Sequence, residues 1–182
     1  MAIPPQERAE LVRLARGAVR ATVTGRPLPK VENPTGVLAE RRGCFVTLKN
    51  RGQLRGCIGC FQPDLPLGEE VVQMGQAAAR DPRFVGNPIT SYEVPELGVE
   101  VSVLSPLEPT DAPEELQVGT HGIYVVCGGR SGCFLPEVAT EMGWDAEQFL
   151  ANCCGHKAGM PPDAWKSPDA TVYLFSSEKF EE

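Results

Sequence analysis

The order of the expected secondary-structure elements repeats along this chain, and the repeat limits its possible folds more than any single motif. Each copy contains a hairpin of two short strands, a helical stretch and a returning strand, as the spacing of apolar residues indicates. The copies cover, in turn, 44–59, 67–80 and 99–105, and then 122–135, 136–154 and 171–176. Gly56-Cys57 and Gly132-Cys133 occupy equivalent places in the two hairpins.

A hairpin followed by a helix and a neighbouring strand predicts an α+β fold, in which antiparallel sheet carries helices packed on one face. A chain of 182 residues can bury most of its apolar surface as one domain, 1–182, with two lobes as the alternative. We divide it into an N-terminal helix and Pro/Gly-rich loop (1–36), a first repeat with the motif RGCIG (37–110) and a second repeat (111–182).

Strand alternation places a set of polar side chains on one face of the first repeat. Successive side chains of a strand point to opposite faces, so Arg55 and Cys57 are expected on the same face. Alternation in the neighbouring strands puts apolar residues on the other face, where helices would cover them. The polar face is then predicted to carry Thr47, Arg55, Cys57, Glu100 and Ser102.

These residue types can build a chemical site. A neighbouring guanidinium favours a thiolate, so Arg55 would lower the pKa of Cys57 and make it a nucleophile, or would instead grip an anionic ligand. Glu100 would act as an acid, a base or the partner of Arg55. Gly56 and Gly59 allow a ligand or another backbone to approach closely. The structural alternative is tight sheet packing with an Arg55–Glu100 ion pair.

Other cysteine and loop motifs offer weaker candidates. Cys57 and Cys60 form a CxxC pair, but a zinc site needs a second pair and a thioredoxin-like site needs a helix start at this point, so we predict no metal and no cofactor. Cys153 and His156 are interpreted as a small buried side chain and a solvated loop residue, and adjacent Cys153-Cys154 are not expected to bind one metal ion together. In the segment DPRF, Arg83 either is solvated in a turn or points inward to join the polar face.

Charge and composition limit the partners. Seventeen Lys and Arg against 24 Asp and Glu give a net charge of −7, which provides no general attraction to nucleic acid or to an anionic membrane. The N-terminus lacks the apolar run of a signal peptide, and no segment reaches the ~20 apolar residues of a membrane span. We therefore expect a cytoplasmic protein whose seven cysteines are free thiols.

Several motifs in a fixed order resemble the AMMECR-like domain family, whose prokaryotic members are called AmmeMemoRadiSam system protein A. The motifs are LRGCIG, DPRF, VEVSVLS, GIYV with FLPEV, GWDAEQFL and KAG before a Trp, and they extend over about residues 8 to 180. The resemblance implies a duplicated α+β unit, and it implies Memo-like and radical SAM proteins as partners. It supplies no activity. Lys157 matches a family motif, whereas Cys60, Glu137 and Gly155-His156 depart from the usual pattern.

Two functions are consistent with the sequence. The first is a cleft around LRGCIG that holds an anionic small molecule or a partner segment, with Cys57 as a thiolate nucleophile and Glu100, Arg83 and Lys157 as further site residues. The second is a non-catalytic adaptor that presents the same face to a Memo-like or radical SAM protein. An RNA-linked role is disfavoured by the acidic charge.

Overall fold

The computed structural model describes residues 2–181 and divides them into two compact units. The first unit runs to Leu104 and includes the stretch from Glu178 onward, and the second covers Ser105–Ser177. Each unit contains a four-stranded sheet and helices, so the predicted α+β class is confirmed, with two antiparallel sheets.

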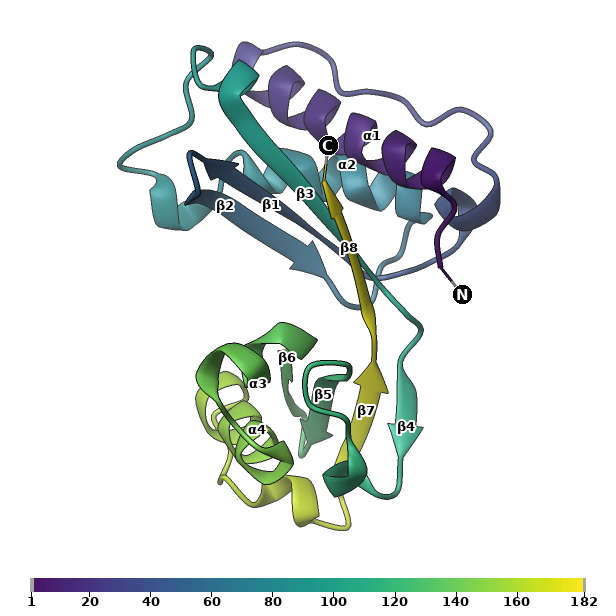
Figure 1. Ribbon diagram of the computed structural model, residues 1–182, viewed down its shortest axis with the longest axis vertical. Helices are drawn as coiled ribbons and strands as arrows, with labels where there is room; N and C mark the ends of the chain where they lie inside the picture. The colour runs from purple at the N-terminus through teal and green to yellow at the C-terminus, as the bar shows by residue number, and fades with distance from the viewer. Residues whose placement is uncertain (1, 182) are drawn as a thin grey trace. The chain divides into compact units, whose positions relative to one another are not determined.

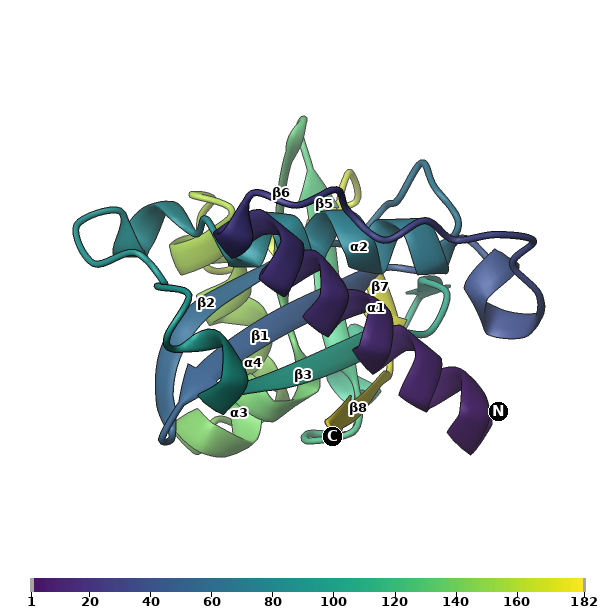
Figure 2. The ribbon, with the colours of Figure 1, turned by 90° about the horizontal axis from the view of Figure 1, so that it is seen from above.

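The sheet of the first unit has the strand order β2-β1-β3-β8. Its strands are β1 (Cys44–Asn50), β2 (Gln53–Cys60), β3 (Leu97–Leu104) and β8 (Ser177–Glu181). Two long helices, α1 (Pro5–Thr24) and α2 (Leu67–Ala78), cover one face of this sheet, as Figures 1 and 2 show. The apolar core of the unit lies between that face and the two helices.

Helix α1 forms because both ends of the segment favour it. Pro5 occupies the first helical turn, where its missing N–H costs nothing, and Gly25 ends the helix in the left-handed conformation that glycine adopts without strain. The side chains that the sequence places on one stripe are buried: Leu11, Leu14, Ala15, Ala18 and Val19.

Short 3-10 turns connect these elements: η1 (Gly36–Ala39), η2 (Pro82–Phe84) and η3 (Val94–Glu96). The last two lie in the segment that leads from α2 back to β3. This segment contains the loop at 81–93, which runs beside β2. Because β2 is an edge strand, the loop meets backbone groups that no neighbouring strand pairs.

The sheet of the second unit has the strand order β4-β7-β5-β6. Its elements are β4 (Glu108–Thr110), η4 (Pro113–Glu115), β5 (Gly122–Cys127), β6 (Arg130–Phe134), α3 (Pro136–Met142), α4 (Ala146–Asn152), the π-helical turn η5 (Cys153–Lys157), η6 (Ala164–Lys166) and β7 (Thr171–Phe175). A capping box between Asp145 and Gln148 starts α4. The ring of Phe134 stacks on Phe149 in the core, with centroids 5.6 Å apart.

The repeat in the sequence corresponds to a repeat in strand register. Cys57 lies opposite Thr47, and Cys133 lies opposite Tyr124. In both sheets the returning strand pairs with the first strand of the hairpin, on the side away from the second. The chain passes from one sheet to the other at two edge strands. β4 follows β3 in sequence but pairs with β7 in the second sheet, and β8 follows β7 in sequence but pairs with β3 in the first sheet.

One irregularity in the first sheet decides the geometry of the motif LRGCIG. Leu48 lies opposite Gly56, but the next residue, Lys49, lies opposite Leu54. Arg55 is therefore the extra residue of a β-bulge, and the alternation of side chains breaks at this point.

Candidate functional site

Strand alternation correctly predicts part of the polar face. Thr47 lies at the centre of a row, with Cys57 opposite on β2 and Glu100 opposite on β3. The Thr47 Oγ1 and Cys57 Sγ atoms are 3.2 Å apart, within hydrogen-bonding distance. Ser102 lies one row further along β3, opposite Phe45, and is buried.

The prediction that Arg55 shares this face with Cys57 is wrong, and the bulge is the reason. Alternation holds only while each residue of β2 has a partner on β1, and Arg55 has none. The same break moves Leu54 off the face that the helices cover, and 40% of this residue is exposed. The expected Arg55–Glu100 ion pair does not form either, because the carboxylate of Glu100 pairs with Lys49 and Lys179, each at 3.4 Å.

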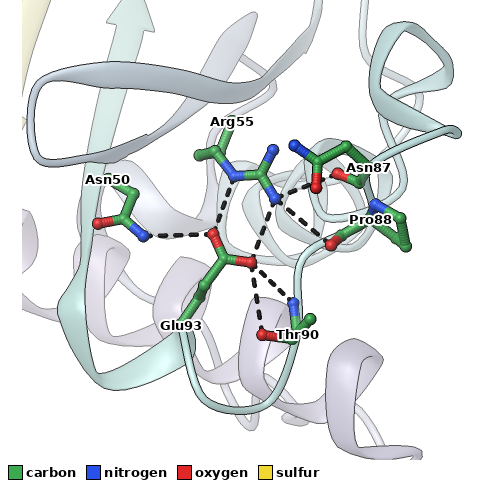
Figure 3. Close-up of polar contacts among 6 residues, drawn as sticks. All are labelled: Asn50, Arg55, Asn87, Pro88, Thr90 and Glu93. Atoms are coloured by element: carbon green, nitrogen blue, oxygen red, sulfur yellow. Dashed lines mark hydrogen bonds and ion pairs between the residues drawn. The ribbon is translucent and has the colours of Figure 1, made fainter.

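Arg55 instead fastens the loop at 81–93 to the sheet (Figure 3). Its Nε and Nη2 atoms donate to the two carboxylate oxygens of Glu93 at 3.0 and 3.2 Å, and Nη2 also donates to the carbonyls of Asn87 and Pro88. Only 9% of the Arg55 side chain is exposed. A buried guanidinium with a bidentate carboxylate is a strong, directional contact.

Glu93 is the second centre of this network. Besides Arg55, its carboxylate accepts hydrogen bonds from Asn50 Nδ2 at 3.2 Å and from the backbone N–H of Thr90 at 3.0 Å. These donors, with Arg55 as the largest contributor, lower the pKa of Glu93 from 4.5 to about 2. The carboxylate is therefore ionised over the whole range in which proteins normally work.

Asp81 and Arg83 of the DPRF segment bind the edge of β2 at Cys57. Asp81 Oδ2 accepts from the Cys57 N–H at 2.9 Å, and Arg83 Nη2 donates to the Cys57 carbonyl at 3.1 Å. Arg83 also donates to Asp81, which lowers the pKa of that carboxyl below its usual range. Although 57% of its side chain is exposed, Arg83 contacts the backbone of Cys57. Arg83, and not Arg55, is therefore the guanidinium beside Cys57.

Phe84 lies between the two arginines. The Cζ atoms of Arg55 and Arg83 are each 5.8 Å from the centre of its ring, within range of cation–π attraction. The ring of Phe84 thus contacts the arginines of two ion pairs, Arg55–Glu93 and Arg83–Asp81.

The two motif glycines are needed for packing. A Cβ atom at Gly56 would collide with the carbonyl oxygen of Ala78, at the end of α2, and one at Gly59 would collide with the ring of Phe45. The close approach predicted at Gly56 is therefore made by another backbone.

Two pockets share Arg55 and Phe84 in their walls. The first, of about 450 Å³, has an apolar wall of Ala79, Pro82, Phe84, Val85, Pro88 and Ile89, together with Arg55, Arg80 and Asp81. The second, of about 650 Å³, is more polar and includes Asn50, Arg51, Leu54, Tyr92, Glu93 and Glu96.

The remaining cysteines lie apart from this cluster. Cys60 lies opposite the buried Cys44, and its thiol is hydrogen-bonded to Glu70 of α2, so the two cysteines of CxxC do not act as a pair. Burial raises the pKa of both the Cys60 thiol and the Glu70 carboxyl. Within residues 2–181, no group of three or more His, Cys, Asp and Glu side chains could hold a metal ion.

Lys157, predicted as a binding residue, belongs to the second unit. Its Nζ atom lies 5.4 Å from the centre of the Phe134 ring. His156, the preceding residue of the same π-helical turn, is exposed. Cys153 of the same turn is fully buried, as predicted, and so is Cys154.

Sequence reasoning missed the partners of Arg55, namely Asn87, Pro88 and Glu93, and the two further donors to Glu93, Asn50 and Thr90. Glu93 is 38 residues from Arg55, and nothing in the chain marks it as different from the acidic residues near it, Asp81 and Glu96. The Asn-Pro pair signals a turn but not what the turn contacts.

Lowering the pH should reduce the free energy of unfolding, because Glu93 becomes protonated and loses its charge. Its pKa is lower in the folded protein than in the unfolded chain, so its stabilisation is present above pH 4.5 and lost as the pH falls towards about 2. Between pH 4.5 and about 2, the unfolding free energy of Glu93→Gln should therefore fall by about 1–2 kcal/mol less than that of the unmodified protein. Urea unfolding at several pH values measures both. An equally steep dependence of the unfolding free energy on pH in the two proteins would contradict this assignment.

The comparisons with known proteins extend over nearly the whole chain. The model of the AMMECR1 family matches residues 12–180. A protein of Methanothermobacter thermautotrophicus is 43% identical and covers 94% of this chain and 92% of its own length, and one of Thermococcus gammatolerans is 46% identical, covering 94% and 88%. The crystal structure of the protein PH0010 from Pyrococcus horikoshii, 41% identical, superposes with a TM-score of 0.84 over 99% of this chain and 93% of that one.

Among the helices of residues 2–181, none has both the length and the apolar character that crossing a membrane requires.

Proposed function

This chain belongs to the AMMECR1 family, and we propose that its first unit is a non-catalytic binding module that docks a protein partner on the loop at 81–93. The docking surface consists of Leu54, Val85 and Tyr92 with the rims of the two pockets beside Phe84. The observation that carries the proposal is the use of Arg55, whose guanidinium holds this loop against the sheet.

The loop presents large apolar side chains to solvent. Tyr92 is 91% exposed and Val85 is 83% exposed, while Ile89 between them in sequence is buried and anchors the loop. Leu54, released from the covered face by the bulge, adds a third exposed apolar side chain at the second pocket. Exposed aromatic and aliphatic residues on a fixed backbone are typical of the anchors that carry binding energy in protein interfaces.

The loop at 81–93 is already fixed in the free protein, and this favours binding because the partner need not order it. A flexible loop loses conformational entropy when it binds, whereas one fixed in its bound form does not. This loop is fixed before any partner arrives by the Arg55–Glu93 ion pair, by the Arg55 contacts with two loop carbonyls, by the bonds of Asp81 and Arg83 to the Cys57 backbone, and by the buried Ile89.

Thiol catalysis at Cys57 has less support. The two groups predicted to assist it are engaged elsewhere: Arg55 binds Glu93, and Glu100 binds Lys49 and Lys179. The contacts that Cys57 does make, with Thr47, Asp81 and Arg83, complete the edge of β2. No base within the described contacts of Cys57 is free to take its proton.

We take the Memo-like protein of the same organism as the partner, on the basis of the family resemblance, and the radical SAM protein as the alternative. Tyr92→Ala should weaken binding of the Memo-like protein by about 30-fold, because removing an interface anchor costs about 2 kcal/mol. Val85→Ala should weaken it less, since its side chain is smaller. Isothermal titration calorimetry with the two purified proteins measures both effects.

The matched control is Met142→Ala, which removes a side chain of 58% exposure from α3 in the second unit. It should leave the affinity unchanged. If Met142→Ala weakens binding and Tyr92→Ala does not, the docking surface lies elsewhere. Binding of the radical SAM protein alone, with the same dependence on Tyr92, would keep the surface and change the partner.

A further inference from the structure

We propose that the first of the two pockets binds a small carboxylate that has an apolar body. We call it the Arg80 pocket, and its walls include Arg55, Ala79, Arg80, Phe84, Val85 and Ile89. This site goes beyond the proposed docking role, because it needs no protein partner. Its size, about 450 Å³, suits a ligand with one aromatic ring or a branched aliphatic chain.

The charge around the pocket favours an anion. Glu93 neutralises Arg55, and Asp81 neutralises Arg83. Arg80, also in the wall, forms no ion pair with any other residue of 2–181. One positive charge is therefore left over at the rim of this pocket, although the chain as a whole carries −7.

Arg55 supplies a second donor. Its Nε and Nη2 atoms make all of the hydrogen bonds found for this side chain within the described residues, and Nη1 carries no dashed line in Figure 3. The side chain is 9% exposed and belongs to the pocket wall. Nη1 is not among the buried side-chain atoms of residues 2–181 that lack a hydrogen-bond partner, so solvent reaches it, and a ligand oxygen would take the place of that solvent.

The remaining wall is apolar. Pro82, Val85, Pro88 and Ile89 offer aliphatic surface, and Phe84 offers an aromatic ring. Burial of an apolar ligand body against this surface would supply the main driving force, while the unpaired charge of Arg80 selects the carboxylate over a neutral group. The N–H of Arg55, whose charge Glu93 neutralises, donates to the oxygen of either. The arrangement differs from the cleft expected from the sequence, in which Arg55 would grip an anion with both arms of its fork, because Glu93 occupies that fork.

The test uses 4-phenylbutyrate as the probe and 4-phenylbutyramide as a neutral analogue of nearly the same shape. Titration of the full chain with labelled Val and Ile methyl groups, followed by NMR, should shift the signals of Val85 and Ile89 in a saturable way. The acid should bind about tenfold more tightly than the amide, the ratio expected for one charge-assisted contact of about 1.4 kcal/mol.

Arg80→Gln should reduce the acid to the affinity of the amide, without changing the affinity of the amide. The matched control is Arg51→Gln, which removes a guanidinium from the second pocket and should leave the preference for the acid intact. Equal binding of acid and amide by the unmodified protein would overturn the proposal. Tighter binding of the acid than of the amide by Arg80→Gln would also overturn it. The same holds if the ligand shifts other methyl signals but not those of Val85 and Ile89. Because no partner protein is present, these results do not depend on the docking surface.

Discussion

Replacing Arg55 with methionine should lower the free energy of unfolding by about 3 kcal/mol, among the largest effects expected of any single substitution in this protein. Methionine keeps much of the length of the side chain but removes the charge, so Glu93 loses both of its guanidinium contacts. The carbonyls of Asn87 and Pro88 lose their donor at the same time. Urea unfolding of the purified variant measures the change.

A second ion pair provides the control for this experiment. Arg51 and Glu96 form a pair of similar length, 3.1 Å, but 83% and 56% of their side chains are exposed. Arg51→Met should therefore change the unfolding free energy by less than about 0.5 kcal/mol. Adding Glu93→Gln to Arg55→Met should recover about 1 kcal/mol, because it removes the unpaired charge. Equal costs for Arg51→Met and Arg55→Met would show that Arg55 does not fasten the loop.

Gly56→Ala should cost about 2–3 kcal/mol through steric overlap, and more if α2 cannot move. The added Cβ atom would meet the carbonyl oxygen of Ala78, which is backbone at the end of α2 and has no alternative rotamer. The backbone at Gly56 itself does not require glycine, since its φ lies outside the left-handed region, so the whole cost comes from the contact. Thermal unfolding followed by circular dichroism measures the loss.

Gly86→Ala is the matched substitution in open space. No atom lies within 4 Å of the Cβ position at Gly86, and its φ is also outside the left-handed region. This variant should be neutral or about 0.5 kcal/mol more stable, because alanine restricts the unfolded chain. A loss of stability at Gly86 as large as the loss at Gly56 would exclude the steric explanation.

The polar row shows how far periodicity alone can reach. Thr47, Cys57 and Glu100 lie opposite one another because the three strands pair without interruption at that level, and a period of two then determines which side chains share a face. The apolar stripe of α1 is predictable for the same reason, since a regular helix converts spacing directly into direction.

Arg55 shows where this reasoning stops. It lies two residues from Cys57, yet a single unpaired position in β2 turns it towards the loop and away from Glu100. A bulge depends on how two strands pair, which a single strand does not record. The same holds for Glu93, whose role follows from the path of a loop 38 residues further along the chain.

The sequence by itself determined the α+β class, the repeated order of strands and helices, and the positions of the motif glycines, because these depend on local periodicity and on residue size. Only the tertiary structure decided that Arg55 is a buried anchor of the loop, that Arg83 is the cation beside Cys57, and that Val85 and Tyr92 project into solvent. The physical reason is that charged side chains have many possible partners, and the packing of distant segments selects among them.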